Sequence, residues 1–350
     1  MKNFLILVSA LISLHGEVAF AEDVENWHTQ LRNLNKECRS LAHEKQSDRA
    51  LEISQKALDL AIKSTSGNSP EVAKSMLQQG DLYFSLRDGA RAEKLFLGVR
   101  SIWEKSGGAN NPAIGEALDS LALLYMRKGE FGKAEAFYLG SLSLREKYYG
   151  NSHEFVGISI YNLGSLYFKS EQYAQAEVMF QRALPIAERA AGVASIDAAV
   201  TPDKLSLAEI HLGKVEEADA IYQRMLNIGD TILVPGRTEL AVLLEHLPST
   251  YMTIKQYAKV EFMLQKSLPL LEQKLGKTDP FVVRNLILLS NCYVENGHSE
   301  QAEPLRVRAA EIVGVAGGAL LAGSELKDAS LTTSGKISAS VDGSLSLKNH

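Results

Sequence analysis

Acidic side chains recur at a fixed interval along this chain of 350 residues, and they are the first candidates for chemistry. In steps of 42 residues the positions are Glu93, Glu135, Glu177, Asp219, Glu261 and Glu303. Two carboxylates close together would suit acid–base catalysis, but packed helices lie about 8–10 Å apart, so acids one repeat apart form no catalytic pair. Each acid lies in the first turn of a predicted helix, where it stabilises the helix by about 0.3–1 kcal/mol. We therefore predict a structural role for them.

The other residue types that carry chemistry are scattered. The histidines are His15, His28, His43, His153, His211, His246, His298 and His350. None belongs to an HExxH motif or pairs with a cysteine at the spacing of a metal site, and no phosphate loop or G-x-S-x-G motif occurs. The net charge is −5 and no dense run of Lys or Arg is present, which argues against nucleic-acid binding. We predict a protein without enzymatic activity, cofactor or metal.

The 42-residue interval extends to apolar and small residues, so the whole chain is repetitive. One position of the unit is small or apolar in every copy: Ala50, Ala92, Ala134, Ala176, Ala218, Val260 and Ala302. Nine residues earlier the unit has Leu41, Tyr83, Tyr125, Tyr167, Glu209, Tyr251 and Tyr293. No insertion or deletion interrupts the period. Such regularity indicates one structural unit used seven times.

Each unit predicts two amphipathic helices. Apolar residues at helical spacing mark a first helix, as in Leu118, Leu121 and Leu124. Gly129, at the end of that helix, favours a stop, and the second helix begins near the Ala-Glu pair. One helix pair cannot bury its own apolar face, so we expect the pairs to stack.

This pattern resembles the tetratricopeptide repeat, and its 42-residue length is most similar to the repeats of kinesin light chains. The resemblance covers residues 24–311 and implies an all-α, right-handed solenoid of about seven helix pairs with atypical first and last repeats. Two departures matter. Glu209 stands where most other repeats have a tyrosine. Pro248 occupies a close-packing position and should kink or shorten its helix.

The resemblance also implies a binding face, because the first helices of this family line the inner wall of the solenoid. The corresponding residues are Lys74, Phe84, Asp119, Leu123, Met126, Tyr161, Asn162, Ser165, Phe168, Ile210, His246, Met252, Arg284 and Asn291. They suit an extended peptide or a partner helix. The alternative is that they only pack against the next first helix. Asn162 lies where related repeats hold a peptide, but Ser120 and Lys204 break that series.

The two ends of the chain differ from the repeats. Lys2, the apolar run 4–14 and the Ala19-Phe20-Ala21 sequence predict a signal peptide over 1–21, hence export to a bacterial periplasm or beyond. Residues 312–350 are rich in Gly, Ala and Ser and predict a flexible tail. The apolar piece 313–323 could prolong the last helix, and 336–349 carry a hairpin pattern.

Cys38 and Cys292 are the only cysteines, and they lie near opposite ends of the repeat array in sequence, so we expect two free thiols. The function that fits best is a scaffold or adaptor in the cell envelope that binds a protein or peptide without catalysis. The alternative is a structural spacer or self-assembling element whose inner face stays empty.

Overall fold

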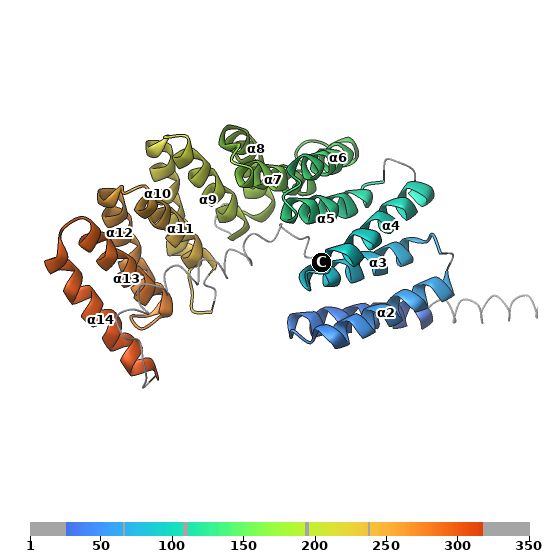
Figure 1. Ribbon diagram of the computed structural model, residues 1–350, viewed down its shortest axis with the longest axis horizontal. Helices are drawn as coiled ribbons and strands as arrows, with labels where there is room; N and C mark the ends of the chain where they lie inside the picture. Colours follow the sequence, from blue (N-terminus) through green and yellow to red (C-terminus); the bar gives the residue numbers. More distant parts are fainter. Residues whose placement is uncertain (1–25, 66, 108–110, 193–195, 237–238, 318–350) are drawn as a thin grey trace, which may run out of the picture. The chain divides into compact units, whose positions relative to one another are not determined.

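The computed structural model describes residues 26–65, 67–107, 111–192, 196–236 and 239–317. Almost all of these residues are helical, and none of them forms a strand (Figure 1). The chain divides between Tyr148 and Tyr149 into two compact units, here called unit 1 and unit 2. Each unit is a stack of helix pairs, which confirms the predicted all-α solenoid class.

Unit 1 contains three helix pairs and unit 2 contains four. The helices of unit 1 are residues 26–43, α2 (Ser47–Ser64), α3 (Pro70–Ser85), α4 (Gly89–Gly107), α5 (Ile114–Arg127) and α6 (Phe131–Tyr149). Unit 2 contains α7 (Glu154–Lys169), α8 (Tyr173–Ala191), α9 (Ile196–His211), α10 (Val215–Ile232), α11 (Glu239–Thr253), α12 (Tyr257–Leu275), α13 (Pro280–Glu295) and α14 (Ser299–Gly317). The second helices α2 to α14 begin every 42 residues, as the repeat predicts.

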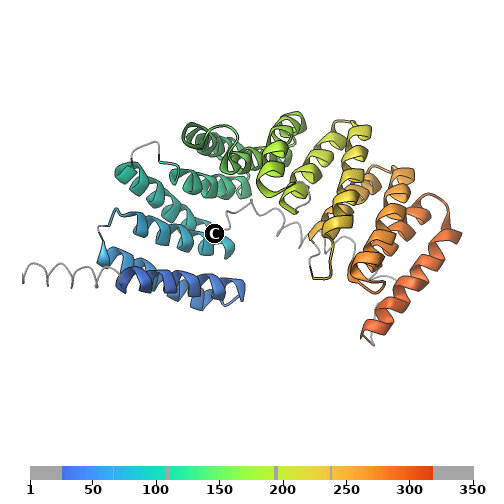
Figure 2. The ribbon, with the colours of Figure 1, turned by 180° about the vertical axis from the view of Figure 1, so that it is seen from behind.

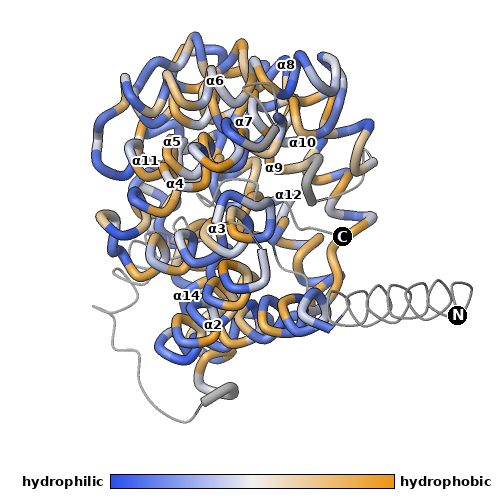
Figure 3. Tube along the Cα trace, turned by 90° about the vertical axis from the view of Figure 1, so that its right-hand side faces the viewer, coloured by the Kyte–Doolittle hydropathy of each residue, from blue (hydrophilic) through white to orange (hydrophobic). Residues whose placement is uncertain are grey.

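Stacking follows one rule in both units. The first helix of a repeat contacts both helices of the repeat before it: α5 contacts α3 and α4, α9 contacts α7 and α8, and α11 contacts α9 and α10. Figures 1 and 2 show the pairs following one another in chain order within each unit. Hydrophobic and hydrophilic residues alternate along each helix (Figure 3), so every pair has an apolar face to bury on its neighbour.

The small repeated residues occupy the tightest places in the core. All seven members of the series from Ala50 to Ala302 are 0% exposed. Glycine is needed at two close approaches: a Cβ at Gly80 would lie 2.5 Å from the Phe96 ring, and a Cβ at Gly164 would lie 2.8 Å from the Phe180 ring. The predicted close packing of first and second helices is therefore confirmed.

The turn inside each repeat has one conformation throughout. The residue at this position has a positive φ in all seven repeats: Lys45, Arg87, Gly129, Glu171, Gly213, Lys255 and Gly297. Only three of the seven are glycine, so in the other four the surrounding helices hold a side-chain-bearing residue in a region it rarely adopts.

Helix α11 continues through Pro248 and is not shortened, contrary to the predicted shortening. Helix α11 has 15 residues, against 14 in α5 and 16 in α13. A proline cannot donate to the carbonyl four residues earlier, here that of Leu244. The buried hydroxyl of Tyr222 donates to this carbonyl at 3.3 Å, so the missing helix bond is replaced by one from α10.

Both cysteines are free and buried, as predicted. Within the described ranges, no helix is long and apolar enough to cross a membrane. The predicted signal peptide at 1–21 and the hairpin pattern at 336–349 lie outside the described residues. Helix α14 continues past residue 312, where the tail was predicted to begin, and ends at Gly317.

Candidate functional site

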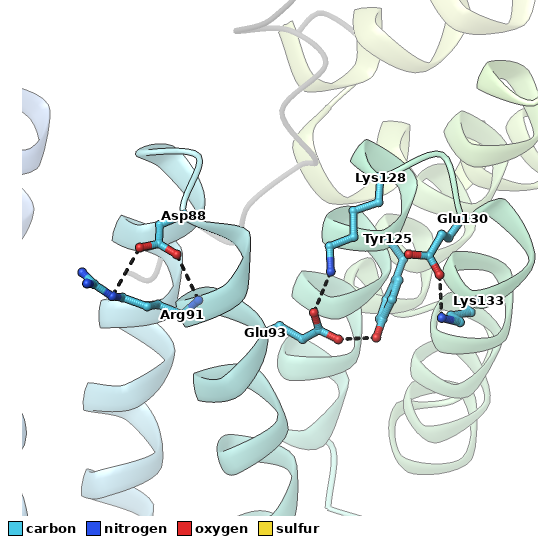
Figure 4. Close-up of polar contacts among 7 residues, drawn as sticks. All are labelled: Asp88, Arg91, Glu93, Tyr125, Lys128, Glu130 and Lys133. Atoms are coloured by element: carbon cyan, nitrogen blue, oxygen red, sulfur yellow. Dashed lines mark hydrogen bonds and ion pairs between the residues drawn. The ribbon is translucent and has the colours of Figure 1, made fainter.

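Four of the six repeated acids, Glu93, Glu177, Asp219 and Glu261, accept hydrogen bonds from side chains of the following repeat. Glu93 on α4 accepts hydrogen bonds from the Tyr125 hydroxyl and, at 2.6 Å, from the Lys128 ammonium (Figure 4). These two donors hold the pKa of Glu93 below its usual value. In unit 2, Asp219 accepts from Tyr251 at 2.8 Å. The tyrosine partner was not foreseen from the sequence, which suggested only an interaction with the helix end.

A different set of charges lies on the first helices of unit 2. Asp203 on α9 is 1% exposed, and its Oδ2 lies 2.9 Å from Nδ1 of His246 on α11. The His246 side chain is 22% exposed. Burial disfavours the imidazolium, but the Asp203 carboxylate outweighs burial, and the pKa of His246 is raised. The aspartate thus holds a histidine that faces outward and gains charge readily.

The next pair repeats this arrangement one unit further on. Glu245 stands 42 residues after Asp203, is buried, and pairs with Arg284 on α13. Burial raises the pKa of Glu245 to about 7, against the opposing effect of Arg284 and His246. The Arg284 side chain is 30% exposed and its guanidinium lies 5.1 Å from the centre of the Phe281 ring. Again the acid is buried and the base is the more exposed partner.

Lys204 adds a third cation to this face. It is partly exposed on α9, and its ammonium lies 6.0 Å from the centre of the Phe168 ring of α7. Lys204, His246 and Arg284 come from three successive first helices, and we call them the basic row. His246 and Arg284 are each held by a buried carboxylate. Their side chains therefore lose less conformational entropy when a ligand binds.

Unit 1 has the reverse order of burial. Arg145 on α6 is 3% exposed and donates to Asp119 on α5 at 2.7 Å, while Asp119 is 16% exposed. Burial raises the pKa of Asp119 more than Arg145 lowers it. Glu116 is half-buried and Asp81 is exposed, and we call Asp81, Glu116 and Asp119 the acidic row. Its members influence one another electrostatically.

The residues predicted for the binding face fall into three groups. Lys74 is exposed. Those partly exposed are Phe84, Asp119, Leu123, Ser165, Phe168, His246, Met252, Arg284 and Asn291. Those buried are Met126, Tyr161, Asn162 and Ile210. Among the buried four, Tyr161 contacts Phe180, and the two ring centres are 5.6 Å apart. All fourteen residues stay predictions of a binding face.

Sequence reasoning missed two residues of these clusters. Asp203 occupies the same repeat position as Asp119 and Glu245, so the 42-residue step could have found it. Arg145 lies on a second helix, and no spacing in the sequence connects it with Asp119. Across the described part of the chain, no group of three or more His, Cys, Asp or Glu residues could hold a metal ion.

Comparison with known proteins agrees with this architecture. Residues 114–189 match the tetratricopeptide repeat family. None of the curated proteins matches the chain.

Three solved structures illustrate the shared fold. A Podosopora anserina protein named for kinesin light chain and TPR-like repeats is 18% identical, with a TM-score of 0.51 over 58% of this chain and 95% of that one. The quorum sensor NprR of B. thuringiensis is 15% identical, with a TM-score of 0.56 over 89% and 84%. A signal-transduction ATPase of Pyrococcus horikoshii with a tetratricopeptide repeat sensor is 15% identical, with a TM-score of 0.61 over 79% and 41%. At these identities the likeness concerns the fold.

Proposed function

We propose that this chain, whose residues 114–189 match the tetratricopeptide repeat family, is a non-catalytic scaffold that binds a protein or peptide through the first helices of unit 2. The observation that carries the proposal is the basic row. His246 and Arg284 are paired with buried carboxylates and remain 22% and 30% exposed. A partner segment that presents carboxylates would add charge-assisted hydrogen bonds to these partly exposed bases.

The surroundings of the basic row suit a peptide. Ser249 is exposed on α11 three residues after His246, and therefore lies on the same helix face. Met252 and Asn291 are partly exposed further along α11 and on α13. Apolar and amide side chains between cations provide contacts for a backbone and for apolar side chains.

The test is a screen of a peptide library against the purified protein, followed by titration of the selected peptides. We expect acidic peptides, and we expect Ser249→Glu to weaken their binding at least tenfold, about 1.4 kcal/mol, because it places a negative charge beside the basic row.

Asn227→Glu is the matched control, since Asn227 is exposed on the second helix α10. It should bind like the unchanged protein, and both variants should keep their helicity. If no peptide is selected, or if both variants bind equally, the alternative of a structural spacer is favoured.

We propose further that the protein works in the bacterial cell envelope. The support is the predicted signal peptide over residues 1–21, with its apolar run and the Ala19-Phe20-Ala21 sequence. Cell fractionation with amino-terminal sequencing checks this, and the expected first residue of the exported protein is Glu22. A product that retains Met1 in the cytosol would contradict it.

A further inference from the structure

One hydrogen bond between consecutive repeats recurs at a fixed position, and we call it the tyrosine latch. A tyrosine of a first helix donates to the acid at the start of the preceding second helix. The pairs are Tyr125 with Glu93, Tyr251 with Asp219 at 2.8 Å, and Tyr293 with Glu261 at 3.3 Å. Each of these bonds joins the start of one second helix to the following first helix at the same repeat position.

The junction of α8 with α9 has no tyrosine at this position. Its acid is Glu177 on α8, and the residue 32 positions later, where the latch tyrosine belongs, is Glu209 on α9. Glu209 is 4% exposed, and its Oε2 has no hydrogen-bond partner among the described residues. Lys214 donates to both oxygens of Glu177 at 2.7 Å each, so the lysine satisfies Glu177 while Glu209 stays incompletely bonded.

The groups that face Glu209 are mostly acidic. They are Glu177 on α8, Glu217 on α10 and the Tyr251 hydroxyl on α11, with Lys214, just before α10, as the cation. Burial, followed by Glu177 and Glu217, raises the pKa of Glu209 to about 7, and Lys214 opposes this. A carboxylate in such surroundings is stable as the neutral acid and costly as the anion.

We propose that the α8–α9 junction is a proton-controlled hinge, in which ionisation of Glu209 loosens the contact that a tyrosine hydroxyl closes at other junctions. A proton from solution binds the Glu209 carboxylate and removes its repulsion from Glu177. Loss of that proton restores two carboxylates in a buried place, where the one lysine, Lys214, is bonded to Glu177. The junction is tight in acid and loose in mild alkali.

The hinge goes beyond the proposed binding function and does not depend on it. Phe168 on α7 and Lys204 on α9 lie on opposite sides of the junction. Movement at the junction would alter their contact, but the hinge is measurable without any partner.

The experiment is hydrogen–deuterium exchange of the full chain at pH 5.5 and 8.0, corrected for intrinsic exchange rates. We expect the protection of α9 amides to fall about tenfold or more at the higher pH, because the ionised junction opens more often. In Glu209→Gln, which has similar size and no charge, the fall in α9 protection should be much smaller, since the remaining pH-dependent contact of α9, between Asp203 and His246, is the same in both proteins.

A transplant supplies the second arm. Tyr125→Glu creates the same acid pair with Glu93 in unit 1, and Tyr125 is only partly buried, so the variant should fold. We expect it to make the protection of α5 pH-dependent. The proposal is overturned if α9 protection is independent of pH in the unchanged protein, or if Glu209→Gln shows the same fall.

Discussion

The two units use the same repeat position in opposite ways. This position holds an acid in three repeats: Asp119 in unit 1, and Asp203 and Glu245 in unit 2. Asp203 follows Asp119 by two repeats, and Glu245 follows Asp203 by one. In unit 1 the base is buried and the acid is the more exposed partner. In unit 2 the acids are buried and the bases are the more exposed partners.

The difference comes from the helix that supplies the base. Arg145 belongs to the second helix of the same repeat, so its guanidinium approaches Asp119 from inside the helix pair. His246 and Arg284 belong to the first helix of the next repeat, so they reach Asp203 and Glu245 from the neighbouring repeat. The same acid position therefore belongs to an acidic row where its base comes from the second helix of the same repeat. It lies beneath a basic row where its base comes from the next first helix. Three predictions would break or sharpen this comparison.

The largest effect is expected in unit 1. Arg145→Met should destabilise the protein by about 3–5 kcal/mol, because it leaves Asp119 largely buried without its cation. Denaturant unfolding at neutral pH measures this. The double variant Arg145→Met, Asp119→Leu should recover most of the loss, since an apolar pair needs no compensation. A loss below about 1 kcal/mol in the single variant would show that Asp119 is already neutral.

A smaller effect that depends on pH is expected in unit 2. The pKa of Glu245 is about 7, above its usual value, so the folded protein favours its neutral form below that pH. Arg284→Met removes the cation that opposes this rise. The loss of folding stability caused by removing that charge should vanish well below pH 7. Above pH 7 this loss should grow by up to about 1.4 kcal/mol per pH unit.

Unfolding at pH 5.5 and 8.0 isolates this effect, because the loss of packing on Phe281 does not vary with pH. The direction follows from proton binding: above pH 7 the variant retains a proton on Glu245 that the unchanged protein has released, so its stability falls faster with rising pH. An equal loss at both pH values would contradict the buried-acid assignment.

The third prediction concerns the latches. Tyr251 is 0% exposed and its hydroxyl donates to Asp219, whereas Tyr125 is partly exposed. Tyr251→Phe should cost about 1–3 kcal/mol because it removes a bond to a charged acceptor, and Tyr125→Phe about 0.5–1.5 kcal/mol because water replaces its hydroxyl. Thermal unfolding of the two variants gives the order, and the reverse order would show that burial does not set the strength of a latch.

Much of the fold could be predicted because, in a stacked repeat, the same sequence positions make the same contacts within each unit and with the next unit. The series from Ala50 to Ala302 predicted the close-packed positions, and the helix starts follow the same grid. The shortening predicted at Pro248 is wrong, since α11 continues through it. The rule that proline weakens a helix is local, but the Tyr222 hydroxyl that replaces the missing bond comes from a neighbouring helix.

The candidate site could be predicted only in part. The residue list of the binding face came from repeat positions, which say which helix face a residue lies on but not how deeply it is buried. Met126, Tyr161, Asn162 and Ile210 share that face with Arg284, yet they are buried and Arg284 is not. Burial depends on the side chains of adjacent repeats, and these differ from one repeat to the next.

The sequence by itself determined the period, the helix pairs, the seven repeats and the small residues that let helices approach, because each follows from contacts within one unit or between identical positions of neighbouring units. Only the tertiary structure decided which charge of each ion pair is buried, that three of the repeated acids bond to tyrosines of the next repeat, and that Glu209 is buried with one carboxylate oxygen unbonded among the described residues. Those outcomes depend on distances between helices far apart in the chain, and the energy of a charge depends on that distance and on burial more than on residue type.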